Sequence, residues 1–546
     1  MTKHKHLIIL LLITIAGLFL RFWHLGTFPV SLNWDEASHG YNAYSILTTG
    51  KDEWGKSFPL IFRAFGDYKL PVYIYLTVIP IFLFGLNAFA VRFVSALAGS
   101  LAIPGIYFLY LKLFPKQSKT FGLLAAFFLA VCPWHFFISR PALEANLALT
   151  FIIYGALFLI KGLKSPRNYL VSAFFFSLSL HTYNTARVFV PLFLLAFFLI
   201  NVRKIKFNKW TFSAIALLLC FFGIVVYQIF SGEGTARYGK LEILSESAVF
   251  QIGTQRTQSK FPPIIAKIVY NRPVYFTTTF IKNYLGYFTP QFISQSKDAQ
   301  TQFAIPGYNL FGWLILLLML VGLIFSRNPL VLSWLFLSPV AAALTADPPQ
   351  ALRPNPMIPA VILLAAFGLS YIASKLSPKI SFIIVSLVVV LVSINFYLFC
   401  QNYFSSYQTT YSQSWQYGYS QVIAYINRFG SSYKNVFITK RYGEPHIFYA
   451  FYDRLNPQML QPGSDNIRFE KSDWYWTDKI GNVYFVNDWQ IPTAIANSLT
   501  LESGGQISTQ NSLLITSPDH LPSNARVLEK INFLDGTPAF IIASIP

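Results

Sequence analysis

Two neighbouring acids, Asp35 and Glu36, are the side chains of this sequence best placed to do chemistry. They follow the first hydrophobic segment and begin a predicted amphipathic helix in the stretch from Asn33 to Tyr41. A carboxylate there could take a proton from a hydroxyl group, or hold a metal ion that does so. The same residues also predict a capping box between Asn33 and Glu36, with Asp35 favouring the helix dipole. Both interpretations stay open from the sequence.

Polar residues around the two acids extend this candidate site. His39 continues the polar side of the predicted helix at helical spacing. Asp67 and Lys69 come just before the apolar stretch from Leu70 to Gly85. They form either a solvated turn, with the lysine extended toward lipid headgroups, or a place where the lysine meets a lipid-linked phosphate.

Three arginines complete the set. Arg92 begins a predicted membrane span, where a charge indicates a functional site, although an arginine at the boundary can also reach the headgroups. Arg140 precedes Glu144 by four residues, a spacing that predicts a pair on one helix face. Arg353 lies in a stiff, proline-rich loop that suits bidentate phosphate binding, and pairing with Asp347 is an equal alternative.

The composition is typical of a protein that crosses a membrane many times. Of 546 residues, 54% are hydrophobic, 18% are aromatic and only 12% are charged, about half the charged fraction of a soluble domain. The chain has 42 basic and 22 acidic residues, but the bases lie in short clusters between apolar segments. Positive-inside topology explains such clusters, so we exclude nucleic-acid binding. Three cysteines without CxxC spacing favour neither disulfides nor a zinc site.

The basic clusters also predict the topology. If residues 70–85 lie at the membrane interface, every basic loop between spans falls on the cytoplasmic side, as the positive-inside rule requires. The N-terminus is then a cytoplasmic signal anchor of a multi-pass cell-membrane protein, and the C-terminus is extracytoplasmic. We expect about eleven transmembrane helices, near residues 7–23, 92–113, 120–138, 143–162, 168–184, 187–202, 211–230, 307–325, 329–346, 357–374 and 380–400.

The predicted fold is therefore mostly α: a polytopic membrane helical bundle with outer-face amphipathic helices and a small C-terminal α/β domain. Residues 1–400 form the transmembrane domain, with large outer loops at 24–91 and 231–306. Residues 401–414 are predicted to be a linker and residues 415–546 the extracytoplasmic α/β domain. Periodicity predicts surface helices over 261–284, a helix over 419–429, strands over 435–440 and 482–487, and a hairpin over 526–545.

The order of these motifs resembles the GT-C superfamily of membrane glycosyltransferases, most closely the branch of protein O-mannosyltransferases and aminoarabinose transferases. The resemblance covers roughly residues 7–375. It implies transfer of a sugar from a polyprenyl-phosphate carrier to a protein, lipid or glycan acceptor at the outer membrane face. The motifs that carry it are Asp35-Glu36, the Lys-x-Pro helix closed by Phe84-Gly85, the stretch from Ala90 to Gly99, and Arg353-Pro354.

Carried over residue by residue, the resemblance implies Asp35 as the catalytic base. Glu36 beside it would position the acceptor or a metal. Arg92 would contact the donor phosphate or steady the active loop, while Lys69 and Arg353 would bind that phosphate. One carboxylate suffices for a transfer that inverts the anomeric carbon, so we expect inversion.

Further substrate-binding candidates are Arg140, His39 and Tyr68. Many members of the superfamily have Lys-Pro-Pro or His-Pro-Pro where this chain has Lys69-Leu70-Pro71, and Tyr68 stands where they have an acid. This difference leaves Asp67 as the candidate ligand if the enzyme uses a divalent metal.

Two other functions stay open. A transporter or lipid flippase would carry midplane charges and broken helices in paired halves, whereas the candidate residues here gather at one predicted face. A non-catalytic membrane assembly subunit would tolerate loss of the Asp35 carboxylate. The sequence does not predict which sugar or which acceptor is used.

Overall fold

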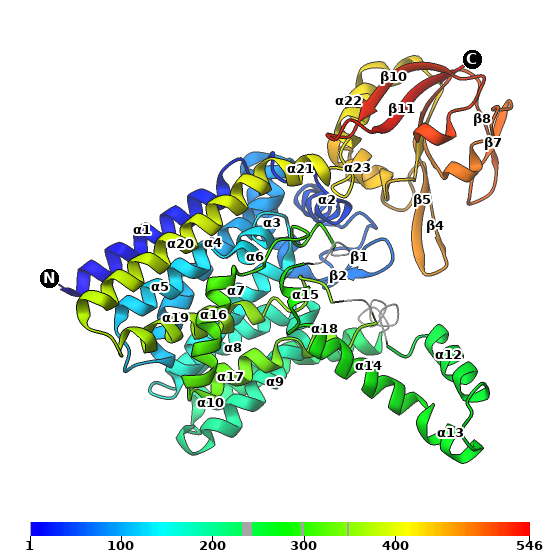
Figure 1. The fold of residues 1–546 in the computed structure, drawn as a ribbon. Helices are drawn as coiled ribbons and strands as arrows, with labels where there is room; N and C mark the ends of the chain where they lie inside the picture. Colours follow the sequence, from blue (N-terminus) through cyan, green and yellow to red (C-terminus); the bar gives the residue numbers. More distant parts are fainter. Residues whose placement is uncertain (1, 232–242, 296–299, 347–348) are drawn as a thin grey trace. The chain divides into compact units, whose positions relative to one another are not determined.

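The chain forms two compact units, each assembled from separate stretches of sequence. The computed structural model describes residues 2–231, 243–295, 300–346 and 349–546 (Figure 1). We call the two units the helical unit and the mixed unit. The helical unit consists of Met1–Trp23, Ser95–Ser139 and Leu143–Cys400, and the mixed unit of His24–Val94, Arg140–Ala142 and Gln401–Pro546. The first large loop region therefore folds with the C-terminal tail.

Helices build the helical unit (Figure 1). Two of them also contribute to the mixed unit, α4 with its first residues, 88–94, and α20 with its last residues, 401–404. In chain order they are α1 (Thr2–Phe22), α4 (Ala88–Leu113), α5 (Lys119–Ala130), α6 (Pro133–Ile138), α7 (Glu144–Gly162), α8 (Arg167–Leu180), α9 (Asn184–Asn201), α10 (Lys209–Phe230), α12 (Glu246–Thr257), α13 (Pro263–Val269), α14 (Arg272–Gly286), α15 (Pro290–Ile293), α16 (Trp313–Phe325), α17 (Pro329–Leu337), α18 (Val340–Ala343), α19 (Met357–Ala373) and α20 (Pro378–Phe404).

Each of the eleven predicted apolar runs coincides with one helix or two consecutive helices, so the prediction of a multi-pass helical membrane protein is confirmed. The number of spans stays a prediction, because the remaining apolar helices have 17 residues or fewer. Among the described residues, the helices long and apolar enough to cross a membrane are Lys5–Phe22, Ala88–Leu113, Glu144–Gly162, Asn184–Lys204, Lys209–Phe230 and Pro378–Thr410.

The second predicted outer loop, 231–306, lies partly outside the described residues. Its described part forms α12 to α15, and the surface helices predicted over 261–284 correspond to α13 and α14. α14 has no buried side chain over its 15 residues. Its last turns are anchored within the helical unit, since Asn283 donates to Thr345 O at 2.8 Å and the Tyr284 hydroxyl donates to Phe336 O at 2.8 Å.

Glycines let helices α16 and α19 approach until their backbones touch. A Cβ atom on Gly322 would lie 2.0 Å from Leu364 O, and one on Gly368 would lie 2.0 Å from Leu318 O. Only glycine fits at either position, because both distances are far below any van der Waals contact. Close backbone approach is how membrane helices gain packing energy, since lipid provides no hydrophobic drive between them.

In the mixed unit, residues 24–94 supply short elements that surround the candidate acids. They are α2 (Trp34–Thr49), β1 (Phe62–Arg63), β2 (Tyr68–Lys69), α3 (Pro71–Phe84) and the first turns of α4. The predicted helix over 70–85 is α3; its 14 residues extend roughly 21 Å, less than the thickness of a bilayer core. Its position at the membrane interface stays a prediction.

The C-terminal tail forms a seven-stranded sheet in the order β10-β11-β9-β3-β6-β5-β4. β3 lies parallel to β6 and β9, and the other neighbours are antiparallel. The elements are α21 (Ser406–Thr410), α22 (Tyr419–Phe429), β3 (Asn435–Thr439), α23 (Pro445–Tyr452), β4 (Asn466–Lys471), β5 (Trp474–Ile480), β6 (Val483–Val486), β7 (Ser498–Thr500), β8 (Gln506–Ser508), β9 (Ser512–Thr516), β10 (Arg526–Asn532) and β11 (Pro538–Ile545).

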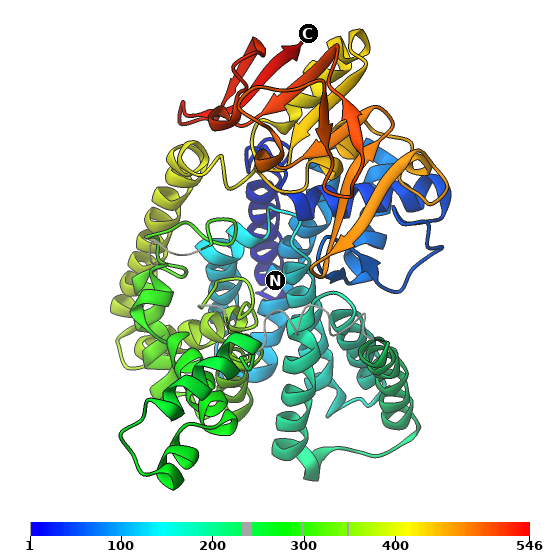
Figure 2. The same cartoon turned by 90° about the vertical axis from the view of Figure 1, so that its right-hand side faces the viewer.

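The predicted C-terminal α/β fold is confirmed. The helix expected over 419–429 is α22, and the hairpin expected over 526–545 is the β10–β11 pair. The β4–β5 hairpin extends beyond the other strands of the sheet (Figures 1 and 2). Residues 401–414, predicted as a linker, contain the last turn of α20 and all of α21, and the predicted domain boundaries stay a prediction.

Replacing either glycine at the α16–α19 contact should destabilise the fold. We expect Gly368→Ala to lower the free energy of unfolding by about 1 to 3 kcal/mol, the usual cost of overpacking, because its Cβ atom meets backbone. Thermal unfolding of purified protein in detergent measures this. The matched control is Gly223→Ala in α10, where a Cβ atom would meet nothing within 4 Å. Equal melting temperatures for the two variants would contradict the prediction.

Candidate functional site

The start of α2 is fixed by the predicted capping box. The Asn33 side chain accepts a hydrogen bond from Glu36 N at 2.9 Å, and Glu36 Oε2 accepts one from Asn33 N at 3.2 Å. This reciprocal pair satisfies two N–H groups that a helix start otherwise leaves without partners. The capping interpretation from the sequence is therefore confirmed.

Glu36 does more than cap the helix, because its side chain is fully buried against Arg92. Arg92 Nε donates to Glu36 Oε1 at 2.9 Å and Arg92 Nη2 donates to Glu36 Oε2 at 3.0 Å. Ala142 N also donates to Oε1 at 2.8 Å. With the bond from Asn33, four donors surround this carboxylate. The geometry favours a positioning role for Glu36, with its oxygen atoms already engaged.

Arg92 uses its remaining N–H groups to hold the chain that leads to α2. Its Nη1 donates to Leu25 O at 3.2 Å and to Pro29 O at 2.8 Å, and its Nη2 donates to Ser31 O at 2.6 Å. Together with the two bonds to Glu36, these contacts employ all five N–H groups of the guanidinium. Of the two roles considered for Arg92, the contacts support steadying the loop.

Arg140 binds the same loop from another part of the chain. Its Nη2 donates to His24 O at 3.3 Å and to Phe28 O at 3.1 Å. Its guanidinium also lies over the rings of Tyr403 and Phe404, at 5.5 and 5.1 Å from the centroids. Because α7 begins only at Glu144, Arg140 lies outside that helix, so the predicted common helix face is wrong, whereas pairing of the two side chains stays a prediction.

Asp35 has surroundings unlike those of its neighbour. Its side chain is 40% exposed, and its Oδ1 lies 2.9 Å from Lys69 Nζ. The lysine is 7% exposed and also approaches Asp67 Oδ1 at 3.5 Å. Pairing of β1 with β2 places Lys69 opposite Phe62 and holds the backbone of the lysine. The structure therefore brings together Asp35, Asp67 and Lys69, with Asp35 the most accessible carboxylate.

The residues around Asp67 do not match a divalent metal site. Within the described ranges, no three His, Cys, Asp or Glu side chains gather closely enough to hold a metal ion. The carboxylates of Asp35 and Asp67 both approach the ammonium of Lys69, whereas magnesium and calcium prefer shells of oxygen ligands. We therefore derive no chemical step from a metal.

The other sequence candidates are distributed differently. His39 is buried, with its ring 5.3 Å from that of Tyr73. Tyr68 shares a side-chain hydrogen bond with Tyr475 of β5. Burial, followed by this hydrogen bond, raises the pKa of Tyr475 to about 12. Arg353 belongs to the helical unit, where its Nη1 donates to the Thr345 hydroxyl at 2.6 Å. Its alternative partner, Asp347, lies outside the described residues.

A second ion pair was missed by the sequence analysis. Arg468 in β4 donates from Nη2 to Glu53 Oε2 at 2.8 Å and from Nη1 to Glu53 O at 2.9 Å. Asn42 in α2 donates to Glu53 Oε1 at 3.0 Å. The Arg468 guanidinium also lies 3.3 Å from the centroid of the Trp54 ring. These contacts connect the β4–β5 hairpin to the loop after α2. The paired residues are 415 positions apart in sequence, so no local pattern predicts the contact.

A buried acid and a buried histidine lie beside this junction. Trp474 Nε1 donates to Glu444 Oε1 at 2.5 Å, and His446 Nδ1 lies 3.4 Å from Glu444 Oε2. Burial raises the pKa of Glu444 to about 7. Burial, followed by repulsion from Arg468 and Lys440, holds the pKa of His446 well below its usual value.

Comparisons with known proteins bear on the fold. Residues 69–227 match the family model of dolichyl-phosphate-mannose-protein mannosyltransferases. No curated protein matches the sequence. Among solved structures, ArnT from Cupriavidus metallidurans in the apo state is similar over 100% of both chains, with 11% identity and a TM-score of 0.52. Its complex with undecaprenyl phosphate covers 100% of this chain and 99% of that chain, with 13% identity and a TM-score of 0.50.

The archaeal oligosaccharyltransferase AglB from Archaeoglobus fulgidus is also similar. Its complex with an inhibitory peptide and a dolichol-phosphate gives a TM-score of 0.51 and 12% identity over 85% of this chain. This chain spans 65% of the length of that protein. At identities this low, the similarity shows the fold, and activity has to be argued from the site itself.

Removing one member of the Arg92–Glu36 pair should destabilise the mixed unit strongly. We expect Arg92→Met to lower the free energy of unfolding by about 3 to 5 kcal/mol, because Glu36 is left as a buried, incompletely paired charge. Denaturant unfolding in detergent measures the loss. The double variant Arg92→Met/Glu36→Leu should recover part of it, since no buried charge then remains. A single variant as stable as the wild type would contradict the assignment.

Glu444 should make stability depend on pH between about 4.5 and 7. The unfolded chain ionises this carboxyl from pH 4.5, while the folded protein keeps it protonated until about pH 7, so stability falls as pH rises through this window. The total loss is about 3 kcal/mol for a pKa shift of this size. Glu444→Gln cannot ionise and should escape it. Melting temperatures of both proteins from pH 4 to 8 should diverge; parallel curves would contradict the prediction.

Proposed function

Because this chain has the fold of the GT-C superfamily of membrane glycosyltransferases, we propose that it transfers a sugar from a polyprenyl-phosphate-linked donor to a protein, lipid or glycan acceptor. The polyprenyl phosphates bound to ArnT and AglB support the class of donor. The peptide bound to AglB supports a peptide among the candidate acceptors. A transporter or flippase is not favoured, since these matches are to glycosyltransferases.

The observation that carries the proposal is the exposed Asp35 carboxylate held by Lys69. The Lys69 ammonium at 2.9 Å fixes the orientation of the Asp35 carboxylate. A carboxylate held in this way is suited to act as a general base. By contrast, Glu36 has its carboxylate surrounded by donors. We assign the base to Asp35 and the positioning of its helix to Glu36.

The proposed reaction is a displacement at the anomeric carbon of the donor sugar. Asp35 accepts the proton of the acceptor hydroxyl as its oxygen forms the new bond to that carbon. The bond between the carbon and the phosphate oxygen breaks, and the polyprenyl phosphate leaves with the electron pair. Attack from the opposite face inverts the configuration, and no second carboxylate is required.

Cations would stabilise the phosphate that leaves. We propose Lys69, in the mixed unit, for this role; phosphate binding by Arg353 of the helical unit stays a prediction. Arg92 and Arg140 act one step away, because their guanidinium groups hold the backbone of residues 24–31 that leads into α2. His39 lies against the ring of Tyr73, and Tyr68 shares a side-chain hydrogen bond with Tyr475; we propose that both line the substrate site.

A metal is not needed for this reaction as written. AglB has been crystallised as a complex with zinc and sulfate. A divalent metal at Asp67 would have to displace Lys69 from between two carboxylates. For the topology, we propose a cytoplasmic N-terminus and an extracytoplasmic C-terminal domain, on the support of the basic loops.

Loss of the Asp35 carboxylate should abolish transfer. We expect Asp35→Asn to lower kcat at least 100-fold, the lower end of what a general base contributes, with little change in stability at this exposed position. The measurement is transfer from radiolabelled polyprenyl-phosphate hexoses by purified protein in lipid. Asp67→Asn is the matched control, because it also removes an acid beside Lys69, and it should cost much less.

Two results would count against the proposal. Equal turnover by wild type, Asp35→Asn and Arg92→Ala would remove the site assignment. Absence of transfer from every polyprenyl-phosphate sugar, by wild-type protein that binds the carrier, would favour a transport or assembly role.

A further inference from the structure

The helical unit contains a cavity of about 430 Å³ at the end of α4 that carries Lys112. This is the opposite end of α4 from Ala88, where that helix begins. Three basic residues from separate parts of the chain line the cavity: Lys112 from α4, Lys204 after α9, and Arg327 before α17. No acid is among its lining residues. The cavity therefore gathers three positive charges without a neutralising carboxylate.

All three cations are exposed, and within the described ranges none of them makes an ion pair with an acid. Like charges that face one cavity repel each other, and the repulsion is stronger beside an apolar membrane than in water. Binding of an anion would relieve it. Lysine and arginine together are well suited to phosphate, the lysine as a point charge and the arginine through its planar set of donors.

The frame of this cavity is held by direct hydrogen bonds. Asn328 follows Arg327, and its side-chain oxygen accepts from Leu330 N and Val331 N at 3.1 and 3.4 Å. Its amide nitrogen donates to Leu113 O at 2.9 Å, next to Lys112. One asparagine thus fastens the start of α17 to the end of α4. These bonds therefore set the spacing between the backbones of Lys112 and Arg327.

The rest of the cavity wall is largely apolar, with Leu113, Ile160, Phe197 and Leu330 among its lining residues. Leu199, on α9 with Phe197 but not among the lining residues, is 66% exposed, as expected of a helix that faces lipid. A ligand that uses the whole cavity needs an anionic head and an apolar body. A small soluble anion would contact only the three cations.

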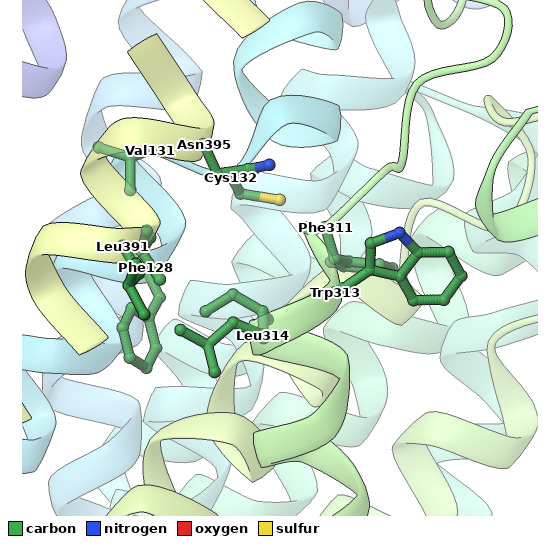
Figure 3. Close-up of a pocket in the computed structure, with 11 residues that line it drawn as sticks. Phe128, Val131, Cys132, Phe311, Trp313, Leu314, Leu391 and Asn395 are labelled. Carbon is green, nitrogen blue, oxygen red and sulfur yellow. The ribbon is translucent and has the colours of Figure 1, made fainter. Parts of the chain in front are cut away.

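A second cavity in the same unit has no charged lining residue, in contrast to the first. It has a volume of about 140 Å³ and lies among α5, α16 and α20 (Figure 3). Its lining includes Phe128, Trp313 and Leu391, with Asn395 and Cys132 as polar side chains and no charged residue. Such a cavity offers nothing to an anionic headgroup. Charge selection is therefore a property of the larger cavity.

We propose that the cavity lined by Lys112, Lys204 and Arg327 is a binding site for the phosphate headgroup of an anionic phospholipid, separate from the proposed donor site. Clusters of lysine and arginine at membrane surfaces attract anionic lipids in this way, and a pocket between helices adds a place for the acyl chain. The three residues come from loops predicted to be cytoplasmic, so the lipid belongs to that leaflet.

The test compares two triple variants of the full-length protein in nanodiscs of phosphatidylcholine and phosphatidylglycerol. The cavity variant is Lys112→Gln/Lys204→Gln/Arg327→Gln. The control is Lys116→Gln/Lys164→Gln/Lys206→Gln, which removes the same charge from neighbouring loop residues that do not line the cavity. Native mass spectrometry after release from the nanodiscs measures retained phosphatidylglycerol, and thermal unfolding checks that each variant is folded.

We expect the cavity variant to bind phosphatidylglycerol roughly 100-fold more weakly, at about fivefold for each cation removed, while the control keeps wild-type binding. Equal retention by the cavity variant and wild type would overturn the proposal, as would an equal loss in the control. A second arm adds inorganic phosphate. Displacement of the lipid by millimolar phosphate would overturn the assignment to a lipid, and no displacement would support it. If the cavity variant does not fold, Arg327→Gln alone, compared with Lys206→Gln, tests the same expectation at about fivefold.

Discussion

The buried ion pair between Glu36 and Arg92 is the interaction on which the mixed unit most depends. Each charge has lost its water, and an ion pair without water is favourable only if nearly every hydrogen-bonding position is filled. Here all five N–H groups of Arg92 are used, and four donors surround Glu36. The pair joins the start of α2, the start of α4 and the chain that leads into α2 into one body. The role proposed for Asp35 as a base requires that this body be rigid.

Two adjacent acids can have such different surroundings because they lie at the start of a helix. Successive helical residues point about 100° apart, so a helix that buries one side chain turns the next away from that contact. Glu36 faces the arginine and is fully buried, whereas Asp35 is 40% exposed and meets Lys69. The capping box fixes the rotation of α2 that produces this division. Helix geometry thus leaves Glu36 to hold the helix start and Asp35 accessible for its proposed role.

Local sequence signals predicted the local structure well. The apolar runs fell on helices, the Asn33–Glu36 cap formed, and the β10–β11 hairpin formed within the predicted residues 526–545. The resemblance to GT-C glycosyltransferases is confirmed by the family model and by the fold. Each of these features depends on residues close together in sequence, or on the order of motifs along the chain.

Contacts between distant segments could not be predicted in the same way. Arg468 reaches Glu53 from β4, a strand that was not predicted from the sequence. Spacing alone predicted that Arg140 and Glu144 share one helix face, but α7 begins only at Glu144, so they do not. Such pairings follow from which surfaces meet after folding, and single-sequence periodicity carries no information about that.

The distribution of positive charge shows why burial has to be known before a cation is given a role. Arg92 lies within the membrane-spanning stretch and was the arginine most suggestive of ligand binding, yet its donors are all consumed by protein atoms. Lys112, Lys204 and Arg327 seemed to be no more than topology signals. They are the cations that face a cavity without an acid beside them. A charge buried in the fold needs a partner from the protein, and an exposed charge at the membrane surface is available to a ligand.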